Sequence, residues 1–224
     1  MPRDTLRKCA AEFLGTFAIV FFGGGSVCMS IRPDIGLGLV GIALAFGLVV
    51  AVMVSSIGHI SGAHFNPAVT FMVFTTRRMT AVAAASYVVA QLAGALAAAF
   101  VLGTIIGPEA IKLGTTGLAV GTSPAAGAAI EAILTFFLVL VIYGTAIDAR
   151  GHKLGGIAIG GVVTLNILMA GPLTGASMNP ARTFGPALAS NHWQHHWVYW
   201  VGPMVGALLA SLVYEKVLAP KSAE

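Results

Sequence analysis

The sequence predicts an all-α membrane protein with six transmembrane helices and two re-entrant half-helices. Three observations lead to this fold class. Of 224 residues, 57% are hydrophobic and only 9% are Asp, Glu, Lys or Arg, whereas about 25% of an ordinary soluble domain is charged. The few charges are separated by long apolar gaps, and one ten-residue motif occurs twice. This composition excludes a soluble enzyme, a disordered chain and a nucleic-acid-binding protein.

The gaps between charges locate the spans, because an apolar helix needs about 20 residues to cross about 30 Å of hydrocarbon. Residues 35–76 and 79–108 carry no charge, and three further gaps each contain a single charge, at Glu12, Glu131 or Arg182. The gap at residues 35–76 is too long for one span and too short for two spans with a loop between them. The pattern predicts spans at 10–29, 37–57, 82–104, 128–147, 156–172 and 197–218.

The basic residues predict how the chain is oriented. With the N-terminus inside, nine of them lie at the inner ends of spans, namely Arg3, Arg7, Lys8, Arg77, Arg78, Arg150, Lys153, Lys216 and Lys221. The outer loops carry only Arg32 and Lys112. Because cytoplasmic loops carry the excess of Lys and Arg, we expect a multi-pass protein of the cell membrane, plasma or inner, with both termini cytoplasmic. The net charge of +4 then reflects topology rather than an anionic partner.

The chain contains an internal repeat. Residues 61–70 read SGAHFNPAVT and residues 174–183 read TGASMNPART, with six identical positions, and Glu12 with its neighbours is echoed at Glu131. We therefore predict a single channel domain over 1–224, built of two repeats, 1–115 and 116–224. Three spans per repeat is an odd number, so the second repeat enters the membrane from the opposite side. Inverted repeats of this kind place their site at the interface near the bilayer midplane.

Each motif predicts a short helix that begins inside the membrane. Asn66 and Asn179 are suited to cap a helix N-terminus, and the prolines that follow them suit its first position. The first such helix is expected from 67 to 77, which spans about 15 Å, half of the hydrocarbon. The loops before the helices, 58–65 and 171–178, would lie at membrane depth without helical hydrogen bonds. Such backbone is tolerated only against protein or water; a lone Asn-Pro pair would indicate a surface turn, but two at matched positions indicate a pore.

Along nearly its whole length, the sequence resembles the aquaporin (major intrinsic protein) family. The resemblance rests on the boxes Asn66-Pro67-Ala68 and Asn179-Pro180-Ala181, on Glu12 and Glu131 at the start of the first and fourth spans, and on Trp200-Val201-Gly202-Pro203. It implies a right-handed helical bundle, a homotetramer with one pore per subunit, and a passive channel for water and small neutral solutes. We expect no enzymatic activity, no cofactor, no metal and no nucleic-acid partner; the lipid bilayer is the other partner.

The residues of the two motifs suggest how such a pore would select. Asn66 and Asn179 would offer amide donors at the centre, and each half-helix N-terminus adds partial positive charge there, so that protons and cations are excluded. Backbone carbonyls of both loops would line the pore, namely those of Gly62, Ala63, His64, Phe65, Gly175, Ala176, Ser177 and Met178.

A single charge distinguishes the second motif from the first, because Arg182 stands where the first has Val69. A charge within a membrane segment indicates function, although a structural arginine neutralised by Glu12 or Glu131 is an alternative. The family resemblance places Arg182 in an outer selectivity filter with Phe46, Ile167 and Ala176. This set has neither the histidine of strict water channels nor the glycine and second aromatic of glycerol facilitators. It resembles the wide, apolar filter of archaeal and nodulin-like members.

Two other functions stay open at this stage. Glu12 and Glu131 could serve a proton-coupled secondary transporter, although the resemblance implies that they accept hydrogen bonds from the pore loops. Within the family, the channel could pass mainly glycerol or another small neutral solute. His192, His195 and His196 could bind a metal, but with Trp193 and Trp197 beside them a belt at the membrane interface is favoured.

Overall fold

The computed structural model describes residues 3–32, 34–152 and 154–219. Within these residues every regular element is a helix, and six helices are long and apolar enough to cross a membrane. The first crossing comprises α1 (Arg3–Ala18), η1 (Ile19–Gly24) and α2 (Gly25–Ser30). The others are α3 (Gly38–Ser61), α5 (Ala81–Ile106), α7 (Pro124–Ile142) with η2 (Tyr143–Ile147), α8 (Gly155–Thr174), and α10 (Val198–Val213) with η3 (Tyr214–Leu218). The all-α class and the six spans are confirmed.

Several predicted boundaries are wrong by a few residues. The first crossing begins at Arg3 instead of residue 10, where an i,i+4 ion pair between Asp4 and Lys8 lies in the first turns. α3 and α8 continue to Ser61 and Thr174, so the loops are shorter than predicted. Both helices end where a glycine adopts a left-handed conformation, at Gly62 (φ 90°) and Gly175 (φ 80°), which glycine adopts without steric cost. A short helix that the charge pattern does not predict, α6 (Pro108–Gly114), follows α5.

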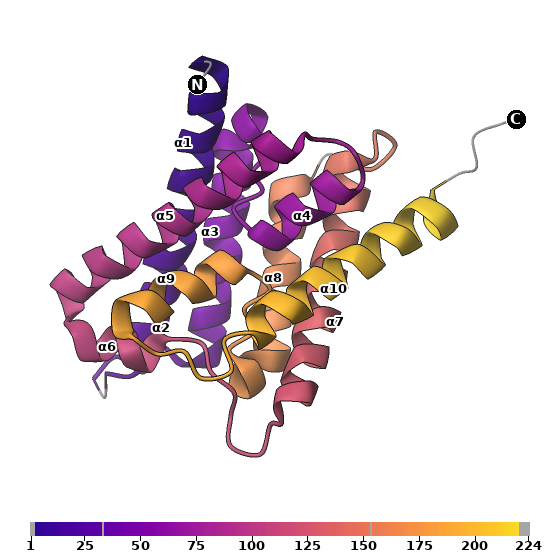
Figure 1. The fold of residues 1–224 in the computed structure, drawn as a ribbon. Coiled ribbons are helices and arrows are strands. Elements are labelled where there is room, and N and C mark those ends of the chain that lie inside the picture. The colour runs from indigo at the N-terminus through magenta and orange to yellow at the C-terminus, as the bar shows by residue number, and fades with distance from the viewer. Residues whose placement is uncertain (1–2, 33, 153, 220–224) are drawn as a thin grey trace, which may run out of the picture.

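Two short helices start inside the bundle, α4 (Pro67–Thr75) and α9 (Pro180–Ser190). The Asn66 side chain caps α4 by accepting from the amide of Ala68 at 2.9 Å. Asn179 caps α9 by accepting from the amides of Ala181 at 3.0 Å and Arg182 at 3.2 Å. In Figure 1 the two helices begin near each other in the middle of the molecule and run toward opposite ends. α4 ends at Thr75, two residues before the predicted end, and Arg77 lies in the left-handed region (φ 59°).

Glycines bring the long helices into close contact. A Cβ atom at Gly94 of α5 would overlap the carbonyl oxygen of Phe13 in α1, and one at Gly206 of α10 would overlap that of Ala132 in α7. Small residues at helix contacts allow this approach in membranes. The close pairs fix the framework in which the two half-helices meet.

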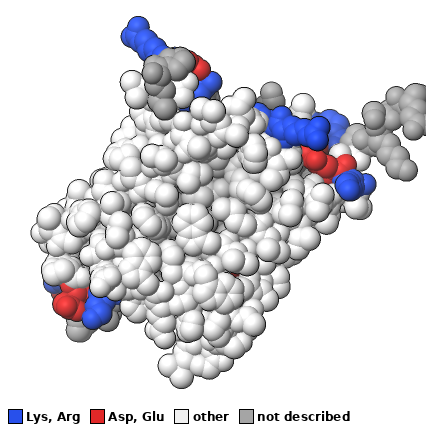
Figure 2. Space-filling view, in the orientation of Figure 1, with Lys and Arg blue, Asp and Glu red and all other residues white. Residues whose placement is uncertain are grey.

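The surface separates charge from apolar area. Figure 2 shows Lys, Arg, Asp and Glu gathered at the ends of the molecule, with a broad face between them that carries almost none. Large apolar side chains of the membrane-spanning helices are well exposed, including Val82 (78%), Ile157 (72%) and Val89 (66%). A soluble protein rarely exposes so continuous an apolar surface, so this belt is the part that faces lipid.

Candidate pore and its lining

A cavity of about 240 Å³ runs between the two half-helix starts and is lined by residues of both sequence motifs. All four residues predicted for the filter line it, namely Phe46, Ile167, Ala176 and Arg182. Most of the predicted loop residues do as well, namely Gly62, Ala63, His64, Phe65, Ser177 and Met178, together with Asn66 and Asn179. Gly175 instead lines a second cavity of about 210 Å³. Pro67, Ala68, Pro180 and Ala181 are buried beside the lining and give the half-helices their starting geometry.

Glu12 holds the first loop. Its side chain is fully buried, and one carboxylate oxygen accepts from Ser61 Oγ (2.6 Å) and the amide of His64 (3.0 Å). The other accepts from the amide of Phe65 (2.6 Å) and from Gln91 Nε2 (2.8 Å). Four donors therefore converge on one carboxylate, which satisfies groups that would otherwise be buried without partners.

Glu131 holds the second loop in the same manner. It is also fully buried and accepts from Thr174 Oγ1 (2.7 Å), the amide of Ser177 (2.9 Å) and the amide of Met178 (2.7 Å). Both glutamates thus have their acceptor sites directed at loop donors. Neither lines the cavity, which favours bracing over a titratable relay.

The loop backbone is unusual because non-glycine residues adopt left-handed conformations. Ala63 (φ 51°) and Phe65 (φ 49°) do so in the first loop, and Ala176 (φ 43°) and Met178 (φ 55°) in the second. Such conformations cost non-glycine residues roughly 1–2 kcal/mol each and persist only where the surroundings hold them. Here the two carboxylates accept from successive N–H groups of each loop, which holds the backbone in these conformations.

The two asparagine amides link the loops across the centre. Asn66 Nδ2 donates to the carbonyl oxygen of Met178 at 2.8 Å, and Asn179 Nδ2 donates to that of Phe65 at 2.9 Å. Each amide nitrogen carries two hydrogens, so one hydrogen of each remains for the cavity that both residues line.

Arg182 is a buried charge with free donors. Its residue is 8% exposed, and the guanidinium carbon lies 4.3 Å from the centroid of the Phe46 ring. Among the residues that the structure describes, Nε and Nη1 have no hydrogen-bond partner. None of the ion pairs in the same residues involves Arg182, and Glu131 is occupied by the loop. This geometry argues against the alternative of a structurally neutralised arginine.

Two of the four residues predicted for the filter line both cavities. Ile167 and Arg182 line both the inner cavity and the second one, which is formed with Val27, Leu39, Ile42 and residues 114–117. Phe46 and Ile167 are fully buried, as is Ala176. Two apolar side chains, one methyl group and one guanidinium therefore line the first cavity together.

Sequence reasoning missed four polar residues near this path. Gln91 reaches both Glu12 and Thr70 (2.9 Å), Thr116 donates to Thr183 at 3.1 Å, and Asn166 lies beside Met178. Arg78 lines the cavity and pairs with Glu215 at 3.3 Å. Gln91 and Asn166 carry a signal that could have found them, because each is an isolated amide in an otherwise apolar span.

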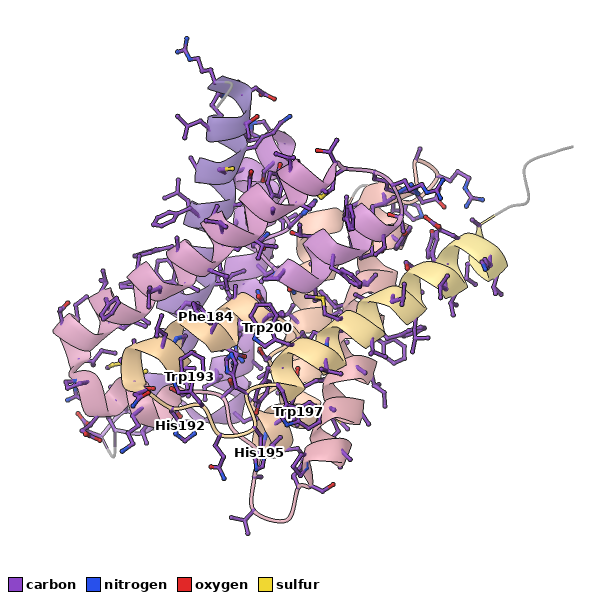
Figure 3. All side chains as sticks on the ribbon, viewed as in Figure 1. Phe184, His192, Trp193, His195, Trp197 and Trp200 are labelled. Atoms are coloured by element: carbon purple, nitrogen blue, oxygen red, sulfur yellow. The ribbon has the colours of Figure 1, made fainter. Side chains whose placement is uncertain are left out.

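Aromatic and histidine side chains gather on the segment that joins α9 to α10 (Figure 3). The Trp193 ring lies 4.9 Å from that of His196, and Trp200 Nε1 donates to His196 Nε2 at 3.1 Å. Burial lowers the pKa of His196, which keeps the ring neutral and able to accept. No group of three potential metal ligands occurs within the described ranges. Trp193 and Trp197 are exposed, as a residue at the membrane interface would be.

Comparisons with known proteins agree on one family. Residues 2–214 match the family described as major intrinsic protein. The chain is 43% identical to the probable aquaporin TIP3-2 of Arabidopsis thaliana, over 97% of this chain and 85% of the relative. It is 46% identical to the lens fiber major intrinsic protein of Lithobates pipiens, over 96% and 82%. Among solved structures, it resembles the aquaglyceroporin from Plasmodium falciparum with a TM-score of 0.86 and 26% identity, covering 96% of this chain and 98% of that one.

Proposed function

Because the chain belongs to the major intrinsic protein family and is a multi-pass membrane channel for water or small solutes rather than an enzyme, we propose that it conducts water together with small neutral solutes. Protons and ions are excluded. Ammonia and hydrogen sulfide are the solutes that we expect beside water, with glycerol passing more slowly. The observation that carries this proposal is the cavity lining around Arg182, where Phe46, Ile167 and Ala176 are apolar.

The proposed filter consists of Phe46, Ile167, Ala176 and Arg182. Its apolar walls lower the cost for a weakly polar solute that has shed its water. They offer the hydroxyl groups of glycerol few partners, and an unpaired buried polar group costs roughly 1–3 kcal/mol. Arg182 supplies the free donors in this filter. These features support the wide, apolar filter type that the sequence resembles.

The remaining roles of the proposal follow from the loops. The boxes Asn66-Pro67-Ala68 and Asn179-Pro180-Ala181 orient water at the centre, and the carbonyl groups of residues 62–65 and 175–178 accept from it along the path. Glu12 and Glu131 brace the loops. We also propose that the two sequence repeats, 1–115 and 116–224, form one channel domain, that four copies assemble, and that both termini face the cytoplasm in the cell membrane.

Glycerol is the second candidate solute. The likeness to the aquaglyceroporin from Plasmodium falciparum extends over 96% of the chain, so the fold accommodates such a channel. The discriminating measurement is the ratio of glycerol to water permeability in proteoliposomes. The wild-type protein should pass water well and glycerol slowly, and Ile167→His, which narrows the filter and adds a donor, should lower glycerol permeability more than water permeability.

Two outcomes would contradict the proposal. If the wild-type protein excludes every solute larger than water, or if Ile167→His leaves the ratio unchanged, the filter is assigned wrongly. Water flux that depends on an imposed pH gradient would instead favour a proton-coupled transporter. We expect water flux to be independent of the pH gradient, because both buried glutamates accept hydrogen bonds from loop donors.

A further inference from the structure

Asn166 is a buried amide whose contacts lie outside the two glutamate networks. It stands in the middle of α8 and is 7% exposed. Its Nδ2 donates to the carbonyl oxygen of Leu134 in α7 at 2.9 Å and lies 2.9 Å from Met178 Sδ. An amide in an apolar helix is costly unless it is paired. Asn166 therefore connects the contact between α7 and α8 to a residue of the pore lining.

Met178 is fixed by its backbone but has a flexible side chain. Its amide donates to Glu131 and its carbonyl oxygen accepts from Asn66, so the main chain cannot shift without breaking both. The side chain has three rotatable bonds, and Met178 lines the same cavity as Asn66, Asn179 and Arg182. The hydrogen bond from Asn166 to sulfur is what directs this side chain toward α7 and α8.

The first motif has a rigid side chain at the position that corresponds to the flexible Met178. Phe65 occupies the position that corresponds to Met178, and its ring fills the space beside Gly15, where a Cβ atom would overlap it. Counted from the glutamates, the counterpart of Gly15 is Leu134. The Leu134 side chain leaves no space of this kind in the second repeat. The thioether of Met178 therefore stands where the first repeat has the Phe65 ring. Thirteen residues before each box stand Met53 and Asn166, and only the second has an amide to hold its partner.

We propose that Asn166 is a positioning residue for solute selectivity, which holds the Met178 thioether against the wall of the cavity and so sets the width of the pore beside Met178. Without the amide, the sulfur rotates into the path and slows larger solutes more than water. The inference rests on the proposed channel function and concerns the part of the pore beside Met178.

A double-mutant cycle in proteoliposomes tests the proposal. Asn166→Leu, Met178→Leu and the double variant are compared with the wild type for water and glycerol permeability. We expect Asn166→Leu to lower the glycerol-to-water ratio by about two- to tenfold, because a net hydrogen bond contributes about 0.5–1.5 kcal/mol and 1.4 kcal/mol corresponds to a factor of ten. In the Met178→Leu background, which has no sulfur to hold, Asn166→Leu should leave the ratio unchanged.

If Asn166→Leu lowers the glycerol-to-water ratio equally in the wild-type and Met178→Leu backgrounds, the proposal is overturned. The effect would then come from the lost hydrogen bond to Leu134 and not from the sulfur. If Asn166→Leu does not reach the membrane, Asn166→Ser replaces it. The serine side chain is too short to reach the sulfur, so we expect the same fall in the glycerol-to-water ratio. Water flux through the wild-type protein in the same vesicles tests the channel function separately. If that flux is absent, the proposed function fails irrespective of Asn166.

Side-chain position is measured directly by oxidation. Dilute hydrogen peroxide transfers one oxygen atom to a methionine thioether and leaves as water, and mass spectrometry follows the sulfoxide at each methionine. We expect Met178 to oxidise several-fold faster in Asn166→Leu than in the wild type, with the fully buried Met72 unchanged as internal control. Equal rates at Met178 in both proteins would overturn the proposal.

Discussion

At the scale of single residues, Arg182 combines burial with unused hydrogen-bond donors. Burying a charge without a paired acid is costly, so a residue kept in this state indicates function more strongly than stability. The Phe46 ring at 4.3 Å offers a cation–π contact, which is worth about 0.5–2 kcal/mol. A water molecule or solute in the cavity would supply the missing acceptor.

We predict that Arg182→Val retains water permeability and admits protons or other cations. The reason is electrostatic, since two like charges about 4 Å apart repel by about 4 kcal/mol at an effective dielectric constant of 20. Proton flux in proteoliposomes is followed with an enclosed pH dye, and Val69→Leu serves as a matched control in the other half-helix. If proton flux stays at background while water still flows, the half-helix dipoles and asparagines form the barrier alone.

Mercurial sensitivity is also decided by single residues. Neither Cys9 nor Cys28 lines either cavity, whereas Ala176 does. We predict weak inhibition of the wild-type protein by mercuric chloride and strong inhibition of Ala176→Cys, measured as the rate of osmotic shrinkage. Strong inhibition of the wild type that disappears in Cys28→Ser would show that the path runs elsewhere.

At the scale of elements, each pore loop depends on one carboxylate. We predict that Glu131→Ala lowers the free energy of unfolding by several kcal/mol, because three donors lose their acceptor and each buried unsatisfied group costs about 1–3 kcal/mol. Thermal unfolding in detergent provides the measurement, and the exposed Glu109 of α6 provides the control, Glu109→Ala. A stability loss no greater than that of the control would show that the loop keeps its structure without the Glu131 carboxylate.

Helix contacts give a second prediction at this scale. Gly206→Ala should destabilise the protein by about 1–3 kcal/mol, the usual cost of overpacking, because the new methyl group would meet the carbonyl oxygen of Ala132. Gly161→Ala in α8 is the matched control, since nothing lies within 4 Å of the position that its Cβ would occupy. Melting temperatures of the two variants should differ clearly; similar values would contradict the close contact of α7 and α10.

Sequence predicted the spans well because charges are excluded from hydrocarbon, so the gaps between them mark the crossings directly. It located the helix ends less well. α3 and α8 stop at glycines whose left-handed backbone is a property of the folded loop, and α1 begins before its apolar stretch does. The Asn-Pro boxes identified the half-helices because capping is local. The partners of Gln91 and Asn166 could not be predicted, since each lies on another helix and depends on how the helices pack.

At the scale of the whole molecule, the start of α1 and the far end of the helix that α10 begins lie toward the same end of the bundle (Figure 1). The loop of residues 115–123, which carries the fully exposed Val120, should face the opposite side from the exposed His152. In a Cys9→Ser background we predict that a membrane-impermeant maleimide labels Val120→Cys in intact cells and labels His152→Cys only after permeabilisation. The reverse pattern would place the termini outside.

The reciprocal bonds between the two loops have a consequence for how the protein is made. Asn66 reaches a carbonyl group 112 residues later in the chain, and Asn179 one that lies 114 residues earlier. While the ribosome is still adding the second half, the Asn66 amide lacks its acceptor and the Phe65 carbonyl group lacks its donor. Both groups of the first loop must therefore stay hydrated. The central pair of bonds can form only after both halves have been synthesised, because each bond joins one loop to the other. A chain interrupted before residue 178 would therefore lack both of the hydrogen bonds that join the two loops.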